Sequence, residues 1–162
     1  TGGARRRSCA RSIGMTRFGY TLMTEQSGPK ELVRYAAKAE QAGFDFEVAS
    51  DHYFPWLSSQ GHAPYVWSVL GAVAHVTERV DLCTYVTCPI LRYHPAVVAQ
   101  KAATVQLLAE GRFTLGLGTQ IRPQIEKRFG AQFDRPVQRM TEFVAALRAI
   151  STSWETGCAT ST

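Results

Sequence analysis

The run Phe44-Asp45-Phe46-Glu47-Val48-Ala49-Ser50-Asp51-His52 joins a short apolar segment directly to an acid and an imidazole. The part from Phe44 to Ala49 predicts a buried strand. A strand end that carries Asp51 and His52, with Trp56 just beyond, is typical of repeated β/α folds, in which ligands bind outside the carboxyl ends of the strands. Histidine titrates near neutral pH, so His52 is the leading candidate for proton transfer. A turn in which Asp51 simply pairs with His52 is the structural alternative.

The strand and helix signals repeat along the chain. The predicted strands cover 17–22, 44–49, 80–86 and 112–117, and the predicted helices begin near Pro29, Pro64, Pro95 and Pro136. Strand starts recur at intervals of about 27 to 36 residues, the length of a β/α unit, which predicts a parallel sheet with helical crossovers. A (β/α)8 barrel typically takes about 250 residues. The α/β chain therefore fits either a small open sheet or roughly half of a barrel.

The basic charge is concentrated at the N-terminus. The 162 residues carry a net charge of +5, of which Arg5, Arg6, Arg7 and Arg11 supply four. The remaining 14 basic and 13 acidic residues nearly balance, so we expect no nucleic-acid partner. We interpret residues 1–14 as a disordered basic extension, 15–152 as a partial (β/α) barrel domain and 153–162 as a disordered tail.

Hydropathy and cysteine spacing exclude further classes of protein. No apolar run approaches the ~20 residues that cross a bilayer, so we expect no membrane partner. The cysteines at positions 9, 83, 88 and 158 form no Cys-x-x-Cys pair, and we expect neither a metal site nor a disulfide framework. Reduced thiols of this kind favour a cytoplasmic protein.

Polar, glycine and aromatic residues follow each predicted strand, and parallel strands would bring them to one end of the sheet. In strand order they are Glu25; Asp51, His52 and Trp56; Thr84, Tyr85, Val86, Thr87 and Cys88; and Gly116, Gly118, Thr119 and Gln120. Any one of these residues is common in a loop, but their placement at one end of the sheet predicts a ligand-binding site. The run Leu115-Gly116-Leu117-Gly118 lacks the third glycine of a dinucleotide fingerprint. Close approach of a flat ring and tight packing are both open explanations for Gly116.

Several segments resemble the luciferase-like flavin and deazaflavin oxidoreductases. They are Phe18-Gly19-Tyr20, Glu25-Gln26, Ser50 to Trp56, Gly61-His62-Ala63-Pro64 and Arg92 to Gln100. The resemblance covers roughly residues 17 to 150 and is most specific in the Asp-His-x-x-x-Trp and Arg-Tyr-x-Pro blocks. The nearest subgroup is the coenzyme F420-dependent glucose-6-phosphate dehydrogenases.

This resemblance implies a TIM-type (β/α)8 barrel, of which the chain is roughly the N-terminal half, with coenzyme F420 at its carboxyl-end face. It implies an oxidoreductase that transfers a hydride between a small organic substrate and F420. The catalytic residues would be His52 as base or transition-state stabiliser, Trp56 beside the reacting pair, and Glu25 in the substrate pocket.

The same resemblance implies the cofactor contacts. These would be Asp51, Thr84, Tyr85, Val86, Gly118, Thr119 and Gln120, with a non-proline cis peptide at Tyr85-Val86. The acid that the subgroup carries at the position of Ile121 is missing here. Glucose-6-phosphate is therefore not favoured as the substrate, and residues 119–130 look more like another deazaflavin-linked branch.

Other readings stay open at this point. One is an FMN-dependent luciferase-like monooxygenase. Another is a truncated, catalytically silent half-barrel that pairs with a partner, and a homodimer is an alternative to a monomer. A hydrolase with a metal on Asp51, His52 and His62 is poorly supported, because no third acidic ligand has suitable spacing.

Overall fold

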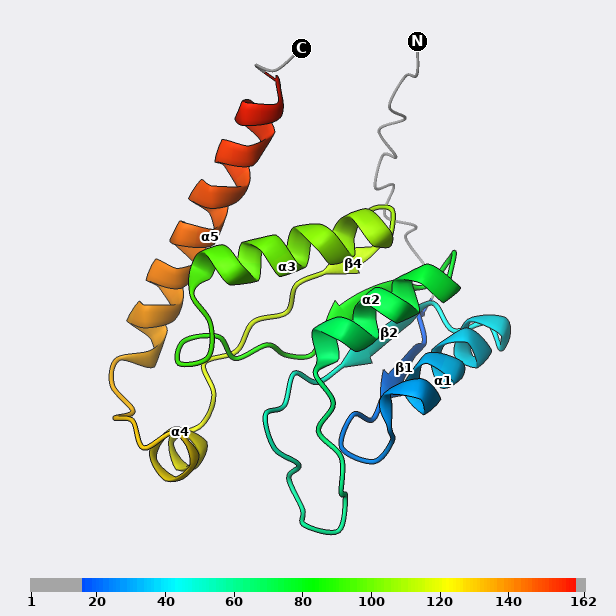
Figure 1. The fold of residues 1–162 in the computed structure, drawn as a ribbon, viewed down its shortest axis with the longest axis horizontal. Coiled ribbons are helices and arrows are strands. Elements are labelled where there is room, and N and C mark those ends of the chain that lie inside the picture. Colours follow the sequence, from blue (N-terminus) through cyan, green and yellow to red (C-terminus); the bar gives the residue numbers. More distant parts are fainter. Residues whose placement is uncertain (1–15, 160–162) are drawn as a thin grey trace.

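The computed structural model describes the backbone of residues 16–159 and the side chains of residues 16–152. The strands are β1 (Gly19–Leu22), β2 (Phe46–Ala49), β3 (Asp81–Thr84) and β4 (Phe113–Thr114). The helices are α1 (Pro29–Gln41), α2 (Val66–Val76), α3 (Pro95–Leu108), α4 (Arg122–Arg128) and α5 (Pro136–Ala159). Strands and helices alternate as far as β4, as Figure 1 shows, and this confirms the predicted α/β class.

The four strands form one parallel sheet in the order β1-β2-β3-β4. Each strand therefore pairs with the next strand in the chain, the arrangement that successive units of a β/α barrel adopt. Leu22 stands opposite Ala49, and Ala49 stands opposite Thr84, so the carboxyl ends of β1, β2 and β3 are level. The loops after these strands consequently start from the same end of the sheet.

Strand β4 is shorter than the predicted strand at 112–117, and the reason lies in one side chain. The Thr84 hydroxyl donates to the Gly116 carbonyl at 2.9 Å and accepts from the Gly116 amide at 2.9 Å. These two bonds replace the backbone ladder at this point. The pairing resumes as an isolated bridge between Thr87 and Leu117.

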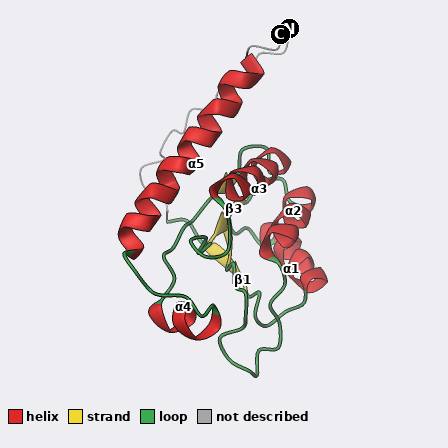
Figure 2. Ribbon diagram, turned by 60° about the vertical axis from the view of Figure 1, so that its left-hand side comes forward, coloured by secondary structure: helices red, strands yellow, loops and turns green. Residues whose placement is uncertain are grey.

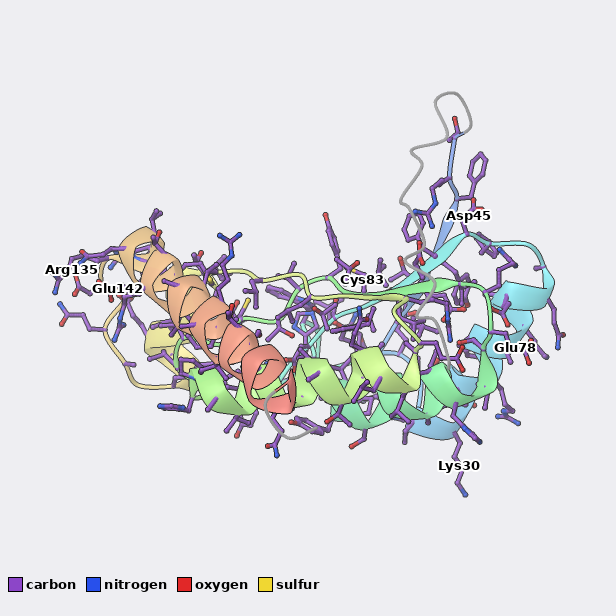
Figure 3. The ribbon with its side chains drawn as sticks, turned by 90° about the horizontal axis from the view of Figure 1, so that it is seen from above. Lys30, Asp45, Glu78, Cys83, Arg135 and Glu142 are labelled. Atoms are coloured by element: carbon purple, nitrogen blue, oxygen red, sulfur yellow. The ribbon has the colours of Figure 1, made fainter. Side chains whose placement is uncertain are left out.

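Helices α1, α2 and α3 lie along one face of the sheet, as the view from above shows (Figure 3). Side chains of alternate strand residues point into this layer, because successive residues of a strand face opposite sides. Leu22, Ala49 and Leu82 are buried there among apolar side chains of the helices. The main core therefore sits between the sheet and these three helices.

Helix α5 packs beside α3 (Figure 2) through a second apolar cluster. That cluster consists of Val98, Ala99, Phe143 and Leu147. Helix α5 continues to Ala159, through most of the segment predicted as a tail, whereas the predicted basic extension at 1–14 lies outside the described residues. None of the helices within 16–159 combines the length and the apolar character that a membrane span needs.

Candidate active site

Hydrogen bonds connect the loops at the carboxyl end of the sheet, here called the rim (residues 23–25, 50–56, 85–88 and 116–120). The Thr24 hydroxyl donates to the Ser50 carbonyl at 3.1 Å, and the Ser50 hydroxyl donates to the Tyr85 carbonyl at 3.1 Å. The Tyr85 amide donates to the Ala49 carbonyl at 2.9 Å. These bonds join the ends of three strands, so residues far apart in sequence meet at one place.

Glycines let the fourth strand end approach the third. A Cβ on Gly116 would lie 2.0 Å from the Thr84 carbonyl oxygen, and a Cβ on Gly118 would lie 2.6 Å from Val86 Cγ2. Packing between neighbouring strand ends therefore accounts for Gly116, which is one of the two explanations that the sequence left open. The Gly118 amide also donates to the Thr87 carbonyl at 2.9 Å.

His52 lies at the centre of the rim with two partners for one ring nitrogen. Its Nε2 atom is 2.6 Å from Oε1 of Glu25 and 2.9 Å from Nε1 of Trp56. The indole N–H is a donor only, so it bonds to Nε2 when that nitrogen carries no proton. A protonated Nε2 instead donates to the buried Glu25 carboxylate. The three predicted catalytic residues are thus in contact, and each state of the imidazole has a partner.

The surroundings of His52 favour its neutral form. Burial lowers the pKa of His52 below its ordinary value, and the nearby guanidinium groups of Arg92 and Arg128 lower it further. The carboxylates of Glu25 and Asp51 oppose this shift without cancelling it. A neutral imidazole that has an anionic neighbour is suited to accept a proton near neutral pH.

Asp51 is buried and bonded on all sides by protein groups. Its Oδ2 accepts from Trp67 Nε1 at 3.1 Å and from Thr87 Oγ1 at 3.0 Å. Its Oδ1 accepts from Arg92 Nη2 at 2.9 Å, and its carbonyl accepts from Arg92 Nη1 at 2.5 Å. Three separate elements thereby fix the backbone next to His52. The predicted contact of Asp51 with a cofactor stays a prediction, and the contacts seen are those of a positioning residue.

The sequence did not point to Trp67 and Arg92 as members of this site, whereas Thr87 was expected at the rim. In the sequence, Arg92 stands out only within the Arg-Tyr-x-Pro block, and Trp67 stands among apolar residues of a helix. Their distances from Asp51 along the chain are 41 and 16 residues. The available signal was the presence of an Arg and a Trp, both hydrogen-bond donors, on the segments that pack against the strand end carrying Asp51.

The residues predicted to contact a cofactor differ in their settings. The Thr84 hydroxyl is engaged by Gly116, whereas the Tyr85 side chain is 69% exposed at the rim. The peptide bond between Tyr85 and Val86 is cis, as the resemblance implied. Gln120 has a φ of 67° and lines the same cavity as His52.

This cavity lies between the loop after β2 and helix α4. Its lining consists of His52, Tyr53, Phe54, Trp56, Gln120, Gln124, Arg128 and Phe129. Helix α4, which the sequence analysis did not predict, brings Arg128 across from His52. Within the described part of the chain, no three His, Cys, Asp or Glu side chains are grouped so as to hold a metal ion.

Comparison with known proteins identifies the family. The family model described as luciferase-like monooxygenase matches residues 14–158. The chain belongs to this family. Among curated luciferase-like relatives, the F420-dependent glucose-6-phosphate dehydrogenase of Beutenbergia cavernae is 45% identical over 140 residues, which are 86% of this chain and 41% of that protein. The corresponding dehydrogenase of Amycolatopsis mediterranei is 39% identical over 142 residues, 86% of this chain and 43% of that protein.

Solved structures agree on the luciferase-like fold. An F420-dependent secondary alcohol dehydrogenase, in complex with an F420-acetone adduct, matches with a TM-score of 0.75 and 32% identity. The match covers 82% of this chain and 41% of that one. The structure thus corresponds to four β/α units of a TIM-type barrel, as predicted. The chain spans about two fifths of the length of the curated relatives it matches.

Proposed function

We propose that this chain belongs to an oxidoreductase that transfers a hydride between an alcohol carbon and coenzyme F420, with His52 as the proton acceptor. The observation that carries the proposal is the contact of His52 Nε2 with both Glu25 and Trp56 at the carboxyl end of a parallel sheet. The names of the curated relatives and of the similar solved structure, all F420-dependent dehydrogenases, support it.

The residues of the rim suit a flat, largely apolar ring. The exposed Tyr85 side chain and the partly buried Val86 stand beside the segment that carries His52, because the Ser50 hydroxyl bonds to the Tyr85 carbonyl. Gly118 lets the fourth strand end pack directly against the Val86 side chain. Tyr85, Val86 and Gly118 would therefore hold the deazaflavin, with Thr119 and Gln120 alongside. When bound, F420 would supply a carbon that accepts the hydride.

The chain's own residues handle the proton. Nε2 of His52 would accept the proton of the substrate hydroxyl in place of the Trp56 indole N–H, as the alcohol is oxidised to a carbonyl compound. Oxidised F420, when bound, would supply the acceptor for the hydride. Glu25 stabilises the imidazolium that forms, because an opposite charge 2.6 Å away favours the protonated ring. Asp51 and Arg92 keep the backbone of residue 51 in place, which holds His52 in its orientation.

The proposal is tested by titrating F420 and FMN into the wild-type protein, His52→Ala and the control His75→Ala. His75 is an exposed residue of α2 and has no part in the rim. We expect near-normal F420 binding in all three proteins, with turnover reduced about 10²- to 10⁴-fold only in His52→Ala. Wild-type turnover should fall as the pH drops through the lowered pKa of His52, because protonated His52 accepts no further proton. Loss of both binding and turnover in His52→Ala would give His52 a structural role instead.

The same titration tests two other candidates. An FMN-dependent monooxygenase is favoured by the family description and by a monooxygenase from Streptomyces bottropensis that matches with 26% identity and a TM-score of 0.68. Tight binding of FMN and weak binding of F420 would support that candidate. A chain that binds neither cofactor, but associates with itself or another half-barrel in sedimentation, would support the silent half-barrel.

A further inference from the structure

We propose that Arg128 is a substrate-specificity residue that binds the carboxylate of a hydroxy acid substrate next to His52. This inference rests on the proposed function for the identity of the reaction and adds the class of substrate. It starts from one fact of placement: Arg128, the last residue of α4, lines the same cavity as His52 and Trp56. An anion held by Arg128 would therefore lie beside the group that takes the proton.

The guanidinium of Arg128 is held in place and still keeps free donors. It lies over the Phe54 ring with 4.3 Å between Cζ and the ring centroid, and Nη2 is 3.4 Å from the Pro55 carbonyl oxygen. Stacking uses the face of a guanidinium and leaves its N–H groups directed outward in the plane. A fork that is fixed in this way loses little side-chain entropy when it binds a carboxylate through two hydrogen bonds.

The positive charge of Arg128 is not compensated by a carboxylate of the described residues. The carboxylate of Asp51 pairs with Arg92 at 2.9 Å. On α4 itself, Arg122 pairs with Glu126 at 2.9 Å. Among the described residues, no carboxylate lies within ion-pair distance of Arg128, which contacts the Phe54 ring and the Pro55 carbonyl. A bound anion would supply the missing partner.

The size of the cavity favours a small anion. Its enclosed volume is about 10 Å³, room for about one water molecule, so only one small group of a ligand, such as a carboxylate oxygen, would enter it. A carboxylate attached to the carbinol carbon, or one carbon away, would lie within a few bonds of the hydroxyl that faces His52, whereas a sugar phosphate places its anion several bonds from the reacting carbon. Tyr53 and Phe54, both largely exposed, border the cavity and suit an apolar substituent on the acid.

Binding of the carboxylate would also assist the base. Arg128 is one of the charges that lower the pKa of His52, together with Arg92 and against Glu25 and Asp51. A carboxylate on Arg128 cancels part of this effect, so His52 becomes a stronger base when a substrate of the right charge is present. Neutral alcohols would lack this effect.

The first test uses the protein without any cofactor and therefore does not depend on the proposed reaction. The His52 ring signals are followed by NMR while 2-hydroxybutanoate, its methyl ester or inorganic phosphate is added. We expect the acid to bind and move the His52 signals, with affinity about 10- to 100-fold lower in Arg128→Gln and partly restored in Arg128→Lys. Arg122→Gln, the matched control on the same helix, should bind the acid like wild type.

Several outcomes would overturn the assignment. Equal responses to the acid and its ester, or an undiminished response in Arg128→Gln, would show that Arg128 does not recognise the carboxylate. Binding of phosphate in preference to the acid would assign the residue to a phosphorylated substrate instead. If Arg122→Gln weakened binding to the same extent, the effect of Arg128→Gln would come from the overall positive charge of α4 and not from a specific contact.

The second test measures turnover of the acid and the ester with F420. We expect Arg128→Gln to lower kcat/KM about 10- to 100-fold for the acid and to change it little for the ester. An equal loss for both substrates would contradict a role in specificity. If the acid binds through Arg128 but no substrate is turned over with F420, the proposed function fails while the binding assignment stands.

Discussion

The two ends of the sheet use polar side chains in opposite ways. At the amino end, where Figure 3 labels Asp45 and Glu78, the Glu40 carboxylate accepts from the backbone amides of Glu78, Arg79 and Val80. At the carboxyl end, His52 and Arg128 line a cavity, and the Arg128 guanidinium keeps N–H donors that no carboxylate of the described residues takes. Polar groups that are satisfied within the protein serve stability, and groups left partly unsatisfied are available to a ligand.

Asp51 is an exception to this comparison. It lies at the carboxyl end, but its carboxylate is satisfied by hydrogen bonds within the protein, as that of Glu40 is at the amino end. Asp51→Asn would leave the largely buried Arg92 guanidinium without its counter-charge, and we expect a loss of about 3–5 kcal/mol in the free energy of unfolding. Urea denaturation measures it. The control is Asp134→Asn, whose pair with Arg135 is exposed and should contribute less than about 1 kcal/mol. Similar small losses in both variants would show that Asp51 is not structural.

Glu47 is the exception at the amino end. Both of its carboxylate oxygens are buried without a hydrogen-bond partner, and burial raises its pKa to about 7, with Glu40 adding to the shift and Arg112 opposing it. The folded state therefore keeps a proton that the unfolded chain loses above about pH 4.5, so stability falls as the pH rises from there through 7. We expect Glu47→Gln to raise the free energy of unfolding by about 1–3 kcal/mol at pH 8 and to have little effect near pH 4.

Urea denaturation of Glu47→Gln at the two pH values checks this expectation, with Glu126→Gln on the surface of α4 as control. A variant that is destabilised equally at both values would mean that the carboxylate has a partner in solution. Glu47 would then no longer be an exception to the comparison between the two ends of the sheet.

Glu40 should give the smallest of the three effects. Burial raises its pKa, but hydrogen bonds from the amides of Glu78, Val80 and Arg79 outweigh this and leave the pKa lowered. Such a carboxylate stabilises the fold at pH values above its ordinary pKa, and this contribution is lost as the pH falls. We expect Glu40→Gln to cost about 1–2 kcal/mol at pH 7 and less near pH 3, measured by urea denaturation. A cost that does not change with pH would mean that the charge is unimportant.

The sequence was sufficient for the features that depend on local signals. Proline at the first position marked the starts of α1 and α3, and His94 caps α3 by accepting from the Ala96 amide at 3.2 Å. Helix α2 begins at Val66 and not at Pro64, because Tyr65 is still extended. The family resemblance supplied the cis bond at Tyr85-Val86 and the group of Glu25, His52 and Trp56.

The features that the sequence did not reveal depend on distant partners. The role of Asp51 follows from Thr87 and Arg92, which are 36 and 41 residues away. Strand β4 is short because the Thr84 side chain bonds to the Gly116 backbone in place of the hydrogen bonds between strand backbones. Helix α4 has seven residues, too few for a clear apolar period, so the contact of Arg128 with Phe54 had no local signal.

The hydrogen bonds from Thr24 to Ser50 and from Ser50 to Tyr85 have a mechanical consequence. They connect the ends of β1, β2 and β3 through a continuous series of hydrogen bonds. A displacement at Tyr85 is therefore transmitted towards the loop that carries Glu25. Substitutions at Thr24 and Ser50 should therefore combine non-additively, as expected for members of one network. A change in one rim loop, by evolution or by engineering, would then require matching changes in the neighbouring loops.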